Sequence, residues 1–285
     1  MFKQAERKRA RLRLGITGPS GSGKTLGALL VASGLGKVAM LDTEEGSGEL
    51  YSGQIGYLYD RLAPPFTPER YIAKMKEVEK LDVDVLILDS ISHAWEGTGG
   101  ILDMHDRAVA NNRNSFAAWR EVTPKHNQFV DAMLRCPYHL IATMRSKSDY
   151  ITGVDGSGRM SVRKVGLAPI QRPGMEYEFT TVFDLDMEHR ASVSKDRTSL
   201  FDGKTITLMS DVGRKFAVWL NEGMDTQALF QQMVTEIGQI DNLDWLRTWY
   251  KDHQIEIENL PNSLEIITML TQRKEMLQGE MSTMQ

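Results

Sequence analysis

Apolar runs and helical periodicities alternate along the first half of the chain. Four apolar runs predict strands, at Arg11–Thr17, Lys37–Asp42, Asp84–Asp89 and Tyr138–Met144. Helical spacing of apolar residues falls between them, at Leu26–Ala32, Thr67–Leu81, His93–Asn111 and Phe116–Leu134. The run at residues 84–89 is apolar throughout its interior, as in a parallel strand covered on both faces. This order predicts an α/β fold with a mainly parallel central sheet.

The pattern changes after residue 144. Arg145–Gly174 has little periodicity and several turns with glycine, so we predict a long loop or a mobile hairpin. Glu178–Met187 and Arg190–Ser194 then read as paired strands, and Asp211–Asn221 as a short closing helix. A loop of this length inside a compact domain is usually functional or disordered.

A boundary is expected near residues 221–224, beyond which only helical patterns remain. Leu229, Met233 and Ile237 share one helical face, and Trp245 and Trp249 form an i, i+4 pair. We therefore predict a core at residues 1–222 and a small helical appendage at residues 223–285.

Composition is that of an ordinary globular protein, with 285 residues and a net charge of −4. The charge is uneven, since Met224–Gln285 holds ten Asp and Glu residues and four Lys and Arg residues. The core is thus mildly basic, which permits a nucleic-acid partner without requiring one. Cys136 has no partner for a disulfide within the chain, and no run of about 20 apolar residues could cross a membrane. We expect a cytoplasmic protein without a membrane partner.

One motif dominates the chain. A phosphate-binding loop, G-x-x-x-x-G-K-[ST], is formed by Gly18, Pro19, Ser20, Gly21, Ser22, Gly23, Lys24 and Thr25. A predicted strand precedes it and a predicted helix follows, as this loop requires. Glycines let backbone N–H groups surround phosphate oxygens, and the helix N-terminus favours negative charge. Lys24 reaches the β- and γ-phosphates, while the Thr25 hydroxyl can ligate Mg²⁺. The alternative is a glycine-rich turn with an incidental Lys-Thr pair.

Two acidic strand ends complete the predicted site. Asp89 ends an apolar strand downstream of the loop, where a carboxylate can hold Mg²⁺ beside Thr25. Glu44 and Glu45 follow the strand that ends at Asp42, and either could activate water for attack on phosphate. The six histidines and the single cysteine show no spacing typical of a zinc site.

These segments resemble the RecA-type branch of P-loop ATPases. The segments that carry this resemblance most specifically are Gly18–Thr25, Leu41–Gly48 and Leu88–Ser92. Over Leu12–Leu220 the chain is also similar to AAA-type ATP-binding proteins encoded by phages and prophages. Some of those proteins act in single-strand annealing and recombination. The resemblance implies a RecA-like core that binds ATP and Mg²⁺ and hydrolyses ATP. It places Glu44 at the catalytic glutamate, with Glu45 lacking a counterpart. It also implies a bacterial host cytoplasm if the protein is phage-encoded.

The resemblance implies partners as well. Lys195 and Arg197 match a late Lys-x-Arg pair that reaches the nucleotide of an adjacent subunit, so a homo-oligomer, either a ring or a filament, is expected. Single-stranded DNA is expected at the segment after residue 144, whose cations include Arg145, Lys147, Arg159, Arg163 and Lys164. Thr143 takes the place of a γ-phosphate sensor or caps the strand.

Several alternatives stay open. Phe116 and Trp119 could stack on bases, although a core pair at i, i+3 is favoured. The basic segment could be a surface loop without a ligand. The chain could also be a nucleotide-gated module that binds a protein partner through its C-terminal helices, or a small-molecule kinase with a lid rich in arginine.

Overall fold

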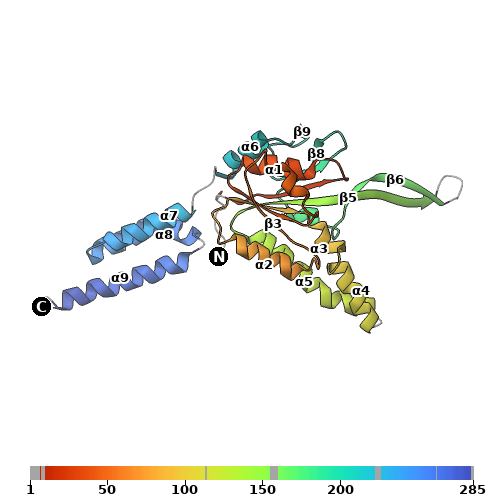
Figure 1. Ribbon diagram of the computed structural model, residues 1–285. Helices are drawn as coiled ribbons and strands as arrows, with labels where there is room; N and C mark the ends of the chain where they lie inside the picture. The colour runs from red at the N-terminus through yellow and green to blue at the C-terminus, as the bar shows by residue number, and fades with distance from the viewer. Residues whose placement is uncertain are drawn as a thin grey trace. The chain divides into compact units, whose positions relative to one another are not determined.

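The computed structural model describes residue 7 and residues 10–112, 114–154, 160–221, 226–260 and 262–283. Contacts divide the chain into two compact units, one spanning Arg11–Leu220 and the other holding the last three helices. The first unit is an α/β layer structure with helices on both faces of a sheet (Figure 1). The predicted fold class is therefore confirmed, including the C-terminal helices.

The central sheet has the strand order β3-β2-β4-β5-β1-β7-β8-β9. Its strands are β1 (Arg13–Gly18), β2 (Val38–Asp42), β3 (Leu58–Arg61), β4 (Val85–Asp89), β5 (His139–Val154), β7 (Thr181–Leu185), β8 (Arg190–Asp196) and β9 (Thr205–Thr207). All pairs from β3 to β7 are parallel, and the pairs β7–β8 and β8–β9 are antiparallel. Carboxyl ends of the parallel strands consequently meet at one edge of the sheet.

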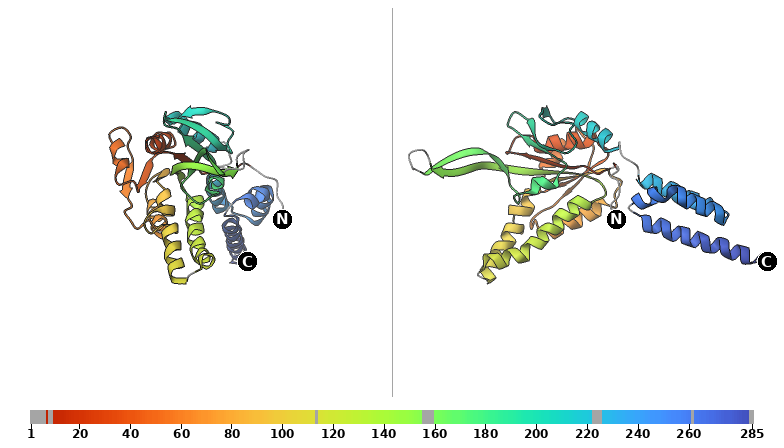
Figure 2. Two further views of the ribbon diagram at one scale, coloured as in Figure 1. Left: turned by 90° about the vertical axis from the view of Figure 1, so that its right-hand side faces the viewer. Right: turned by 180° about the vertical axis from the view of Figure 1, so that it is seen from behind.

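Helices cover the two faces of this sheet. The helices of this unit are α1 (Lys24–Ser33), α2 (Pro68–Val78), α3 (Ser92–Glu96), α4 (Ile101–Asn112), α5 (Ser115–Arg135) and α6 (Ser210–Asn221), with the 3-10 turns η1 (Ser47–Tyr51) and η2 (Met175–Glu178). Of these, α4 packs on α5 and projects away from the sheet (Figure 1). α1 and α6 lie on one face and α2 and α5 on the other (Figures 1 and 2). Thr67 caps α2 by accepting the Arg70 N–H at 3.4 Å, and Pro68 is its first residue, as predicted.

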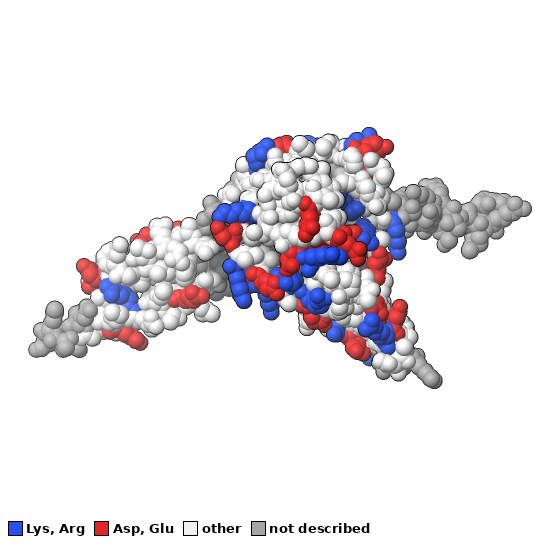
Figure 3. Space-filling model, viewed as in Figure 1, with Lys and Arg blue, Asp and Glu red and all other residues white. Residues whose placement is uncertain are grey.

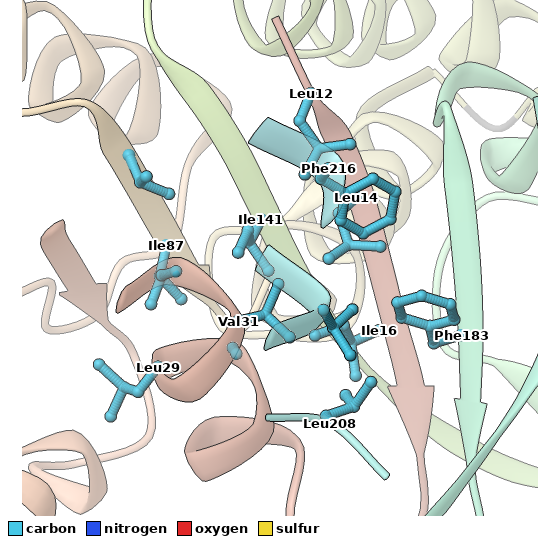
Figure 4. Close-up of a cluster of buried hydrophobic side chains, with 14 of the residues drawn as sticks. Leu12, Leu14, Ile16, Leu29, Val31, Ile87, Ile141, Phe183, Leu208 and Phe216 are labelled. Atoms are coloured by element: carbon cyan, nitrogen blue, oxygen red, sulfur yellow. The ribbon is translucent and has the colours of Figure 1, made fainter. Parts of the chain in front are cut away.

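Two hydrophobic cores follow from strand alternation. Ile87 of β4 packs under α1 with Ile141 and Phe183, as Figure 4 shows. Leu86 and Leu88 point to the other face, toward Tyr71 of α2. Because neighbouring residues of a strand face opposite sides, a strand that is apolar at every position must be covered on both.

The structure corrects several predicted elements. The edge strands β3 and β9 are present where none was predicted, and both are short and mostly exposed, so they lack a continuous apolar run. The predicted helix at residues 93–111 is two helices, α3 and α4, separated at Gly97–Gly100. For the segment after residue 144, the structure agrees with the hairpin alternative: β5 and the antiparallel strand β6 (Met160–Pro169) form a hairpin, which extends away from the sheet in Figure 1.

The second unit contains α7 (Thr226–Gln239), α8 (Leu243–Asn259) and α9 (Ser263–Thr283). Met233 and Ile237 of α7, Trp249 of α8 and Ile266 of α9 meet in one buried cluster. The face predicted from Met233 and Ile237 is therefore the face that forms this core. Cys136, in the first unit, is buried, and its thiol donates to the Met133 carbonyl at 3.2 Å.

Stability of the first unit should depend on the protonation of His139. Its Nδ1 accepts the Leu12 N–H at 3.0 Å, and burial, with Arg11 and Arg13 nearby, lowers its pKa to about 4. The unfolded chain binds the proton at the ordinary value near 6.5. As the pH falls from 6.5 to 4 we expect His139 to remove about 3 kcal/mol from the free energy of unfolding. Urea unfolding across this range should show a shallower pH slope in His139→Gln; equal slopes would contradict the prediction.

Candidate functional site

A single cavity of about 930 Å³ opens where the parallel strands end. Its walls come from the loop after β1, the first two turns of α1, the segment after β2, the ends of β4 and β5, and the β8–β9 region. The residues that carry its charge are Lys24, Glu44, Asp89, Glu96 and Arg145. Segments that are far apart in the sequence thus bring two cations and three carboxylates together.

The loop after β1 depends on its glycines. A Cβ at Gly18 would lie 2.5 Å from Ser22 Oγ, and Gly23 has a φ of 86°, a backbone region that favours glycine. Gly23 is also the N-cap of α1, which has no side-chain cap and no acidic residue in its first turn. The first N–H groups of α1 are therefore not satisfied by a side chain of their own helix, which leaves them for an anion.

Ser22 adds a second sign of an anion site. Its Oγ is buried and has no hydrogen-bond partner among the described residues. A buried polar atom without a partner is costly, and a phosphate oxygen beside the loop would satisfy it. The residues present therefore fit a phosphate group.

Lys24 lies within reach of this loop. Its Nζ donates to the Pro19 carbonyl at 2.8 Å. Burial lowers the pKa of Lys24, and the charges of Asp89 and Glu44 oppose that shift. The Lys24 ammonium therefore lies in a partly buried cavity, where its hydrogen bond to the Pro19 carbonyl can be replaced by one to a phosphate oxygen.

Thr25 and Asp89 form the candidate magnesium site. Thr25 Oγ1 donates to Asp89 Oδ2 at 2.7 Å, and Thr143 Oγ1 donates to Asp89 Oδ1. Burial raises the pKa of Asp89 to about 6, and the two threonine hydrogen bonds act against that rise. A hydroxyl and a carboxylate are hard oxygen ligands of the kind that Mg²⁺ binds with several waters and phosphate oxygens. The donor set fits magnesium, although the described residues contain no cluster of three His, Cys, Asp or Glu side chains that could hold a metal alone.

Glu44 is the carboxylate that faces the phosphate end of the cavity. Arg145 Nε donates to Glu44 Oε1 at 2.8 Å, and Arg145 Nη2 donates to Oε2, so the pair is bidentate. Ser90 Oγ also donates to Oε1, at 3.0 Å. Burial would raise the pKa of Glu44, but the hydrogen bonds and charge of Arg145 outweigh it and lower the pKa. Glu44 is therefore ionised and held in place by Arg145.

Glu45 lies elsewhere. Its side chain is 85% exposed, it does not line the cavity, and its nearest cation is Arg61 at 3.9 Å. The structure thus places Glu44, rather than Glu45, where a water could be activated.

Asp42 organises the segment that carries Glu44. It is fully buried and accepts the N–H groups of Gly46 at 3.0 Å and Gly48 at 3.1 Å, together with the Tyr59 hydroxyl at 2.8 Å. Burial and the bond to Asp42 raise the pKa of Tyr59, so the phenol stays a donor. The geometry of this turn is thus held by one buried carboxylate that accepts from two backbone N–H groups and a phenol.

Lys195 and Arg197 do not line the cavity of their own chain. Lys195 Nζ donates to the carbonyls of Glu176 at 3.0 Å and Tyr177 at 2.6 Å, and Arg197 Nη2 donates to Tyr177 at 3.1 Å. Both cations therefore gather at η2. This placement therefore gives no support for contact between Lys195 or Arg197 and a nucleotide in the cavity of the same chain.

The predicted DNA contacts are distributed unevenly. Arg145 lies in the cavity and Lys147 is exposed on β5. Lys164 and Arg163 lie on β6, opposite Tyr150 and Ile151 of β5, while Arg159 lies outside the described residues. On the face of the first unit drawn in Figure 3, positive and negative side chains are mixed rather than gathered into one basic surface.

Phe116 and Trp119 do not form the favoured core pair. Phe116 is 86% exposed near the start of α5. Trp119 instead stacks on His105 of α4, with ring centroids 4.2 Å apart, and on Trp95 at 6.1 Å. Asn114 caps α5 by accepting the Ala117 N–H at 3.2 Å. Phe116, in the first turn after this cap, lies on the outer face of the helix.

Arg145 is the cavity residue whose position the sequence pattern did not predict. It was assigned to the basic segment, yet β5 pairs with β1 as far as Gly18 and Arg145, so this side chain starts level with the phosphate loop. The sequence does contain a signal for this position. Arg145 directly follows a buried strand, and the carboxyl end of that strand must lie at the same edge of the sheet as the strand that ends at Asp89. Tyr51 and Met209, which also line the cavity, carry no sequence signal at all.

Comparison with known proteins agrees with this geometry. The model of the AAA domain family matches residues 10–213, which covers the whole cavity and most of the first unit. No curated protein gives a significant match to the chain. Of the helices in the described part of the chain, none combines the length and apolar composition needed to cross a membrane. The chain therefore belongs to the AAA domain family of nucleotide-binding P-loop proteins.

Proposed function

We propose that this protein is a Mg²⁺-dependent ATPase that hydrolyses ATP to ADP and phosphate. The observation that carries the proposal is that Lys24, the Thr25–Asp89 pair and Glu44 all face one cavity at the carboxyl ends of the sheet. Phosphoryl transfer to water needs a phosphate cradle, a metal site and a carboxylate to orient the water, and these residues supply all three.

Each side chain then has a defined role. The N–H groups at the start of α1 and the Lys24 ammonium bind the phosphate oxygens. Thr25 and Asp89 would hold Mg²⁺, which neutralises charge on those oxygens when bound. Glu44 accepts a proton from the attacking water. The apolar lining residues Leu30, Tyr51 and Met209 are suited to the flat apolar faces of a nucleobase.

We also propose that the β5–β6 hairpin binds single-stranded DNA, in recombination or replication of the phage type. Thr143 and Arg145 contact Asp89 and Glu44, and the same strand continues into the hairpin through the exposed Lys147. Cations along a projecting ribbon favour contact with a phosphate backbone. Arg163 and Lys164 on β6, and Arg159, extend the same basic segment.

Lys195 and Arg197 support a further part of this proposal, in which each acts on the nucleotide of a neighbouring subunit in a ring or filament. They lie apart from the cavity of their own chain, yet add two positive charges to one surface. Mixing Glu44→Gln with Lys195→Ala should then restore activity that neither variant has alone. Absence of recovery in mixed oligomers would contradict the shared site.

The test of the main proposal is steady-state phosphate release from ATP, with and without single-stranded DNA. Wild type should release phosphate only with Mg²⁺, DNA should stimulate it, and Lys24→Ala serves as the blank. Charge reversal at Lys147, Arg163 and Lys164 should remove stimulation and leave the basal rate unchanged. A basal rate that is equal in wild type and blank would overturn the ATPase proposal, whereas indifference to DNA would overturn only the DNA part.

Replacing Arg145 should change the pH dependence of the reaction. Arg145 is the group that lowers the pKa of Glu44 against the effect of burial. In Arg145→Gln that pKa should rise, so the acidic limb of the kcat/KM profile should move to higher pH. Lys147→Gln, two residues further along β5, is the matched control and should keep the wild-type profile. An unchanged limb in Arg145→Gln would show that Glu44 does not govern it.

A second candidate function is a nucleotide-gated interaction module with little turnover. The observation that favours it is the bidentate ion pair, because a carboxylate engaged by Arg145 at both oxygens is a poor base for water. This candidate predicts tight ATP binding, slow hydrolysis and no response to DNA.

A further inference from the structure

The helical unit carries an apolar groove between α8 and α9. The groove has a volume of about 290 Å³ and is lined by Leu243, Leu246, Arg247, Tyr250, Ile267, Leu270, Thr271 and Lys274. Leu246 and Leu270 form its buried floor, while Tyr250 and Ile267 are 42% and 44% exposed on its sides. Exposed large apolar side chains that lie together on a surface typically mark an interaction site.

The charges at the groove are positive, whereas the segment that forms it is acidic overall. Met224–Gln285 holds ten acidic and only four basic residues, which are Arg247, Lys251, Arg273 and Lys274. Two of the four line the groove, and none of its lining residues is acidic. Arg273 is engaged elsewhere, since its Nε donates to the Ile240 carbonyl at 2.8 Å.

The two cations at the groove are accessible to a ligand. Arg247 lies 3.2 Å from Asp244, but both side chains are largely exposed, at 75% and 93%, and such a surface pair is weak. A carboxylate from a partner can therefore compete for Arg247. Lys274 is exposed on α9 at the same groove.

We propose that this groove binds a short acidic peptide segment of a partner protein, whose apolar side chains enter between Tyr250 and Ile267 and whose carboxylates meet Arg247 and Lys274. An amphipathic segment laid into a groove between two helices is a common mode of peptide recognition. Leucine and isoleucine make up half of the lining residues, which suits aliphatic or aromatic side chains of a peptide. A nucleic-acid strand is less suited, since Tyr250 is the one aromatic residue among the lining residues and base stacking needs several.

The test uses the full-length protein and a random peptide library displayed on phage. Peptides retained by wild type should combine Asp or Glu with large apolar residues. A synthetic peptide of the most enriched sequence should bind in fluorescence polarisation, and added salt should weaken it. Arg247→Glu with Lys274→Glu should lower its affinity about tenfold or more, as expected for two lost ion pairs and two new repulsions. Ile267→Asp, which acts on the apolar side, should also abolish binding.

Lys251→Glu is the matched control, since this exposed lysine of α8 does not line the groove, and it should leave affinity unchanged. Circular dichroism should show the same helical content in all variants, because the substituted side chains are exposed. Enriched peptides without carboxylates would overturn the proposal, as would equal retention by wild type and the charge-reversed variant. Competition by oligothymidylate would assign the groove to nucleic acid, and a shift in sedimentation between wild type and Ile267→Asp would assign it to a second copy of the chain.

Discussion

A Glu44→Gln variant should bind ATP as tightly as wild type and hydrolyse it about 10²–10⁴ times more slowly. The amide keeps the size of the side chain, and its oxygen can still accept hydrogen bonds from Arg145 Nε and Ser90, while the bond from Arg145 Nη2 is lost because an amide nitrogen cannot accept it. What is lost is the negative charge that takes the proton from water. The reduction should therefore appear in kcat and not in KM, provided that chemistry limits turnover.

Glu45→Gln is the control for this experiment. Glu45 is adjacent in sequence and has the same chemistry, but its side chain is 85% exposed and points away from the cavity. It should hydrolyse ATP at the wild-type rate. If Glu45→Gln were the slow variant and Glu44→Gln the normal one, the assignment of the base would be wrong. Nucleotide affinity, followed with a fluorescent ATP analogue, separates either result from a loss of binding.

The buried part of the sheet could be predicted because its strands leave little freedom. β4 and the first half of β5 are apolar at nearly every interior position, and both lie between helical layers. The edges could not be predicted in the same way. β3 exposes Leu58, Asp60 and Arg61, so its pairing with β2 is determined by backbone hydrogen bonds that leave no trace in the hydrophobic pattern.

The site shows a similar division. The phosphate loop and Asp89 are local signals, in which the residues that act are also the residues that define the motif. Arg145 is different, because its role depends on β5 lying between β4 and β1, which brings it level with Gly18 and near Glu44. The sequence pattern placed it with the other cations of the hairpin. Arg145 can be placed in the cavity only when the strand order is known, and the pattern of a single sequence does not give that order.

This position of Arg145 gives the hairpin a physical connection to the cavity. Thr143 and Arg145 lie on one strand and contact Asp89 and Glu44, and the strand continues without a break into the β5–β6 ribbon. A displacement of the ribbon by a ligand would therefore act on two carboxylates of the site at once. Coupling of this kind follows from strand continuity and requires no separate relay of residues.

The second large effect is expected at Lys24. A Lys24→Ala variant should lose both nucleotide binding and hydrolysis, with a fall in kcat/KM of about 10³ or more. The cavity holds Lys24 and Arg145 against Glu44, Asp89 and Glu96. Without Lys24, three carboxylates face one cation, and that cation is already paired with Glu44. The site should then repel a triphosphate as well as lack a direct contact to it.

Binding of the fluorescent ATP analogue distinguishes this outcome from that of Glu44→Gln, which should bind normally. Lys37→Ala is the matched control, because Lys37 is an exposed lysine that pairs with Asp82 and does not line the cavity. It should retain wild-type binding and turnover. Lys24→Arg adds a further comparison, since it keeps the charge but places a longer planar group in a loop that Gly18 and Gly23 shape closely around Ser22. We expect Lys24→Arg to recover nucleotide binding in part and hydrolysis hardly at all, because the loop determines where the ammonium lies relative to Thr25 and Asp89. If charge alone mattered, Lys24→Arg would recover binding fully.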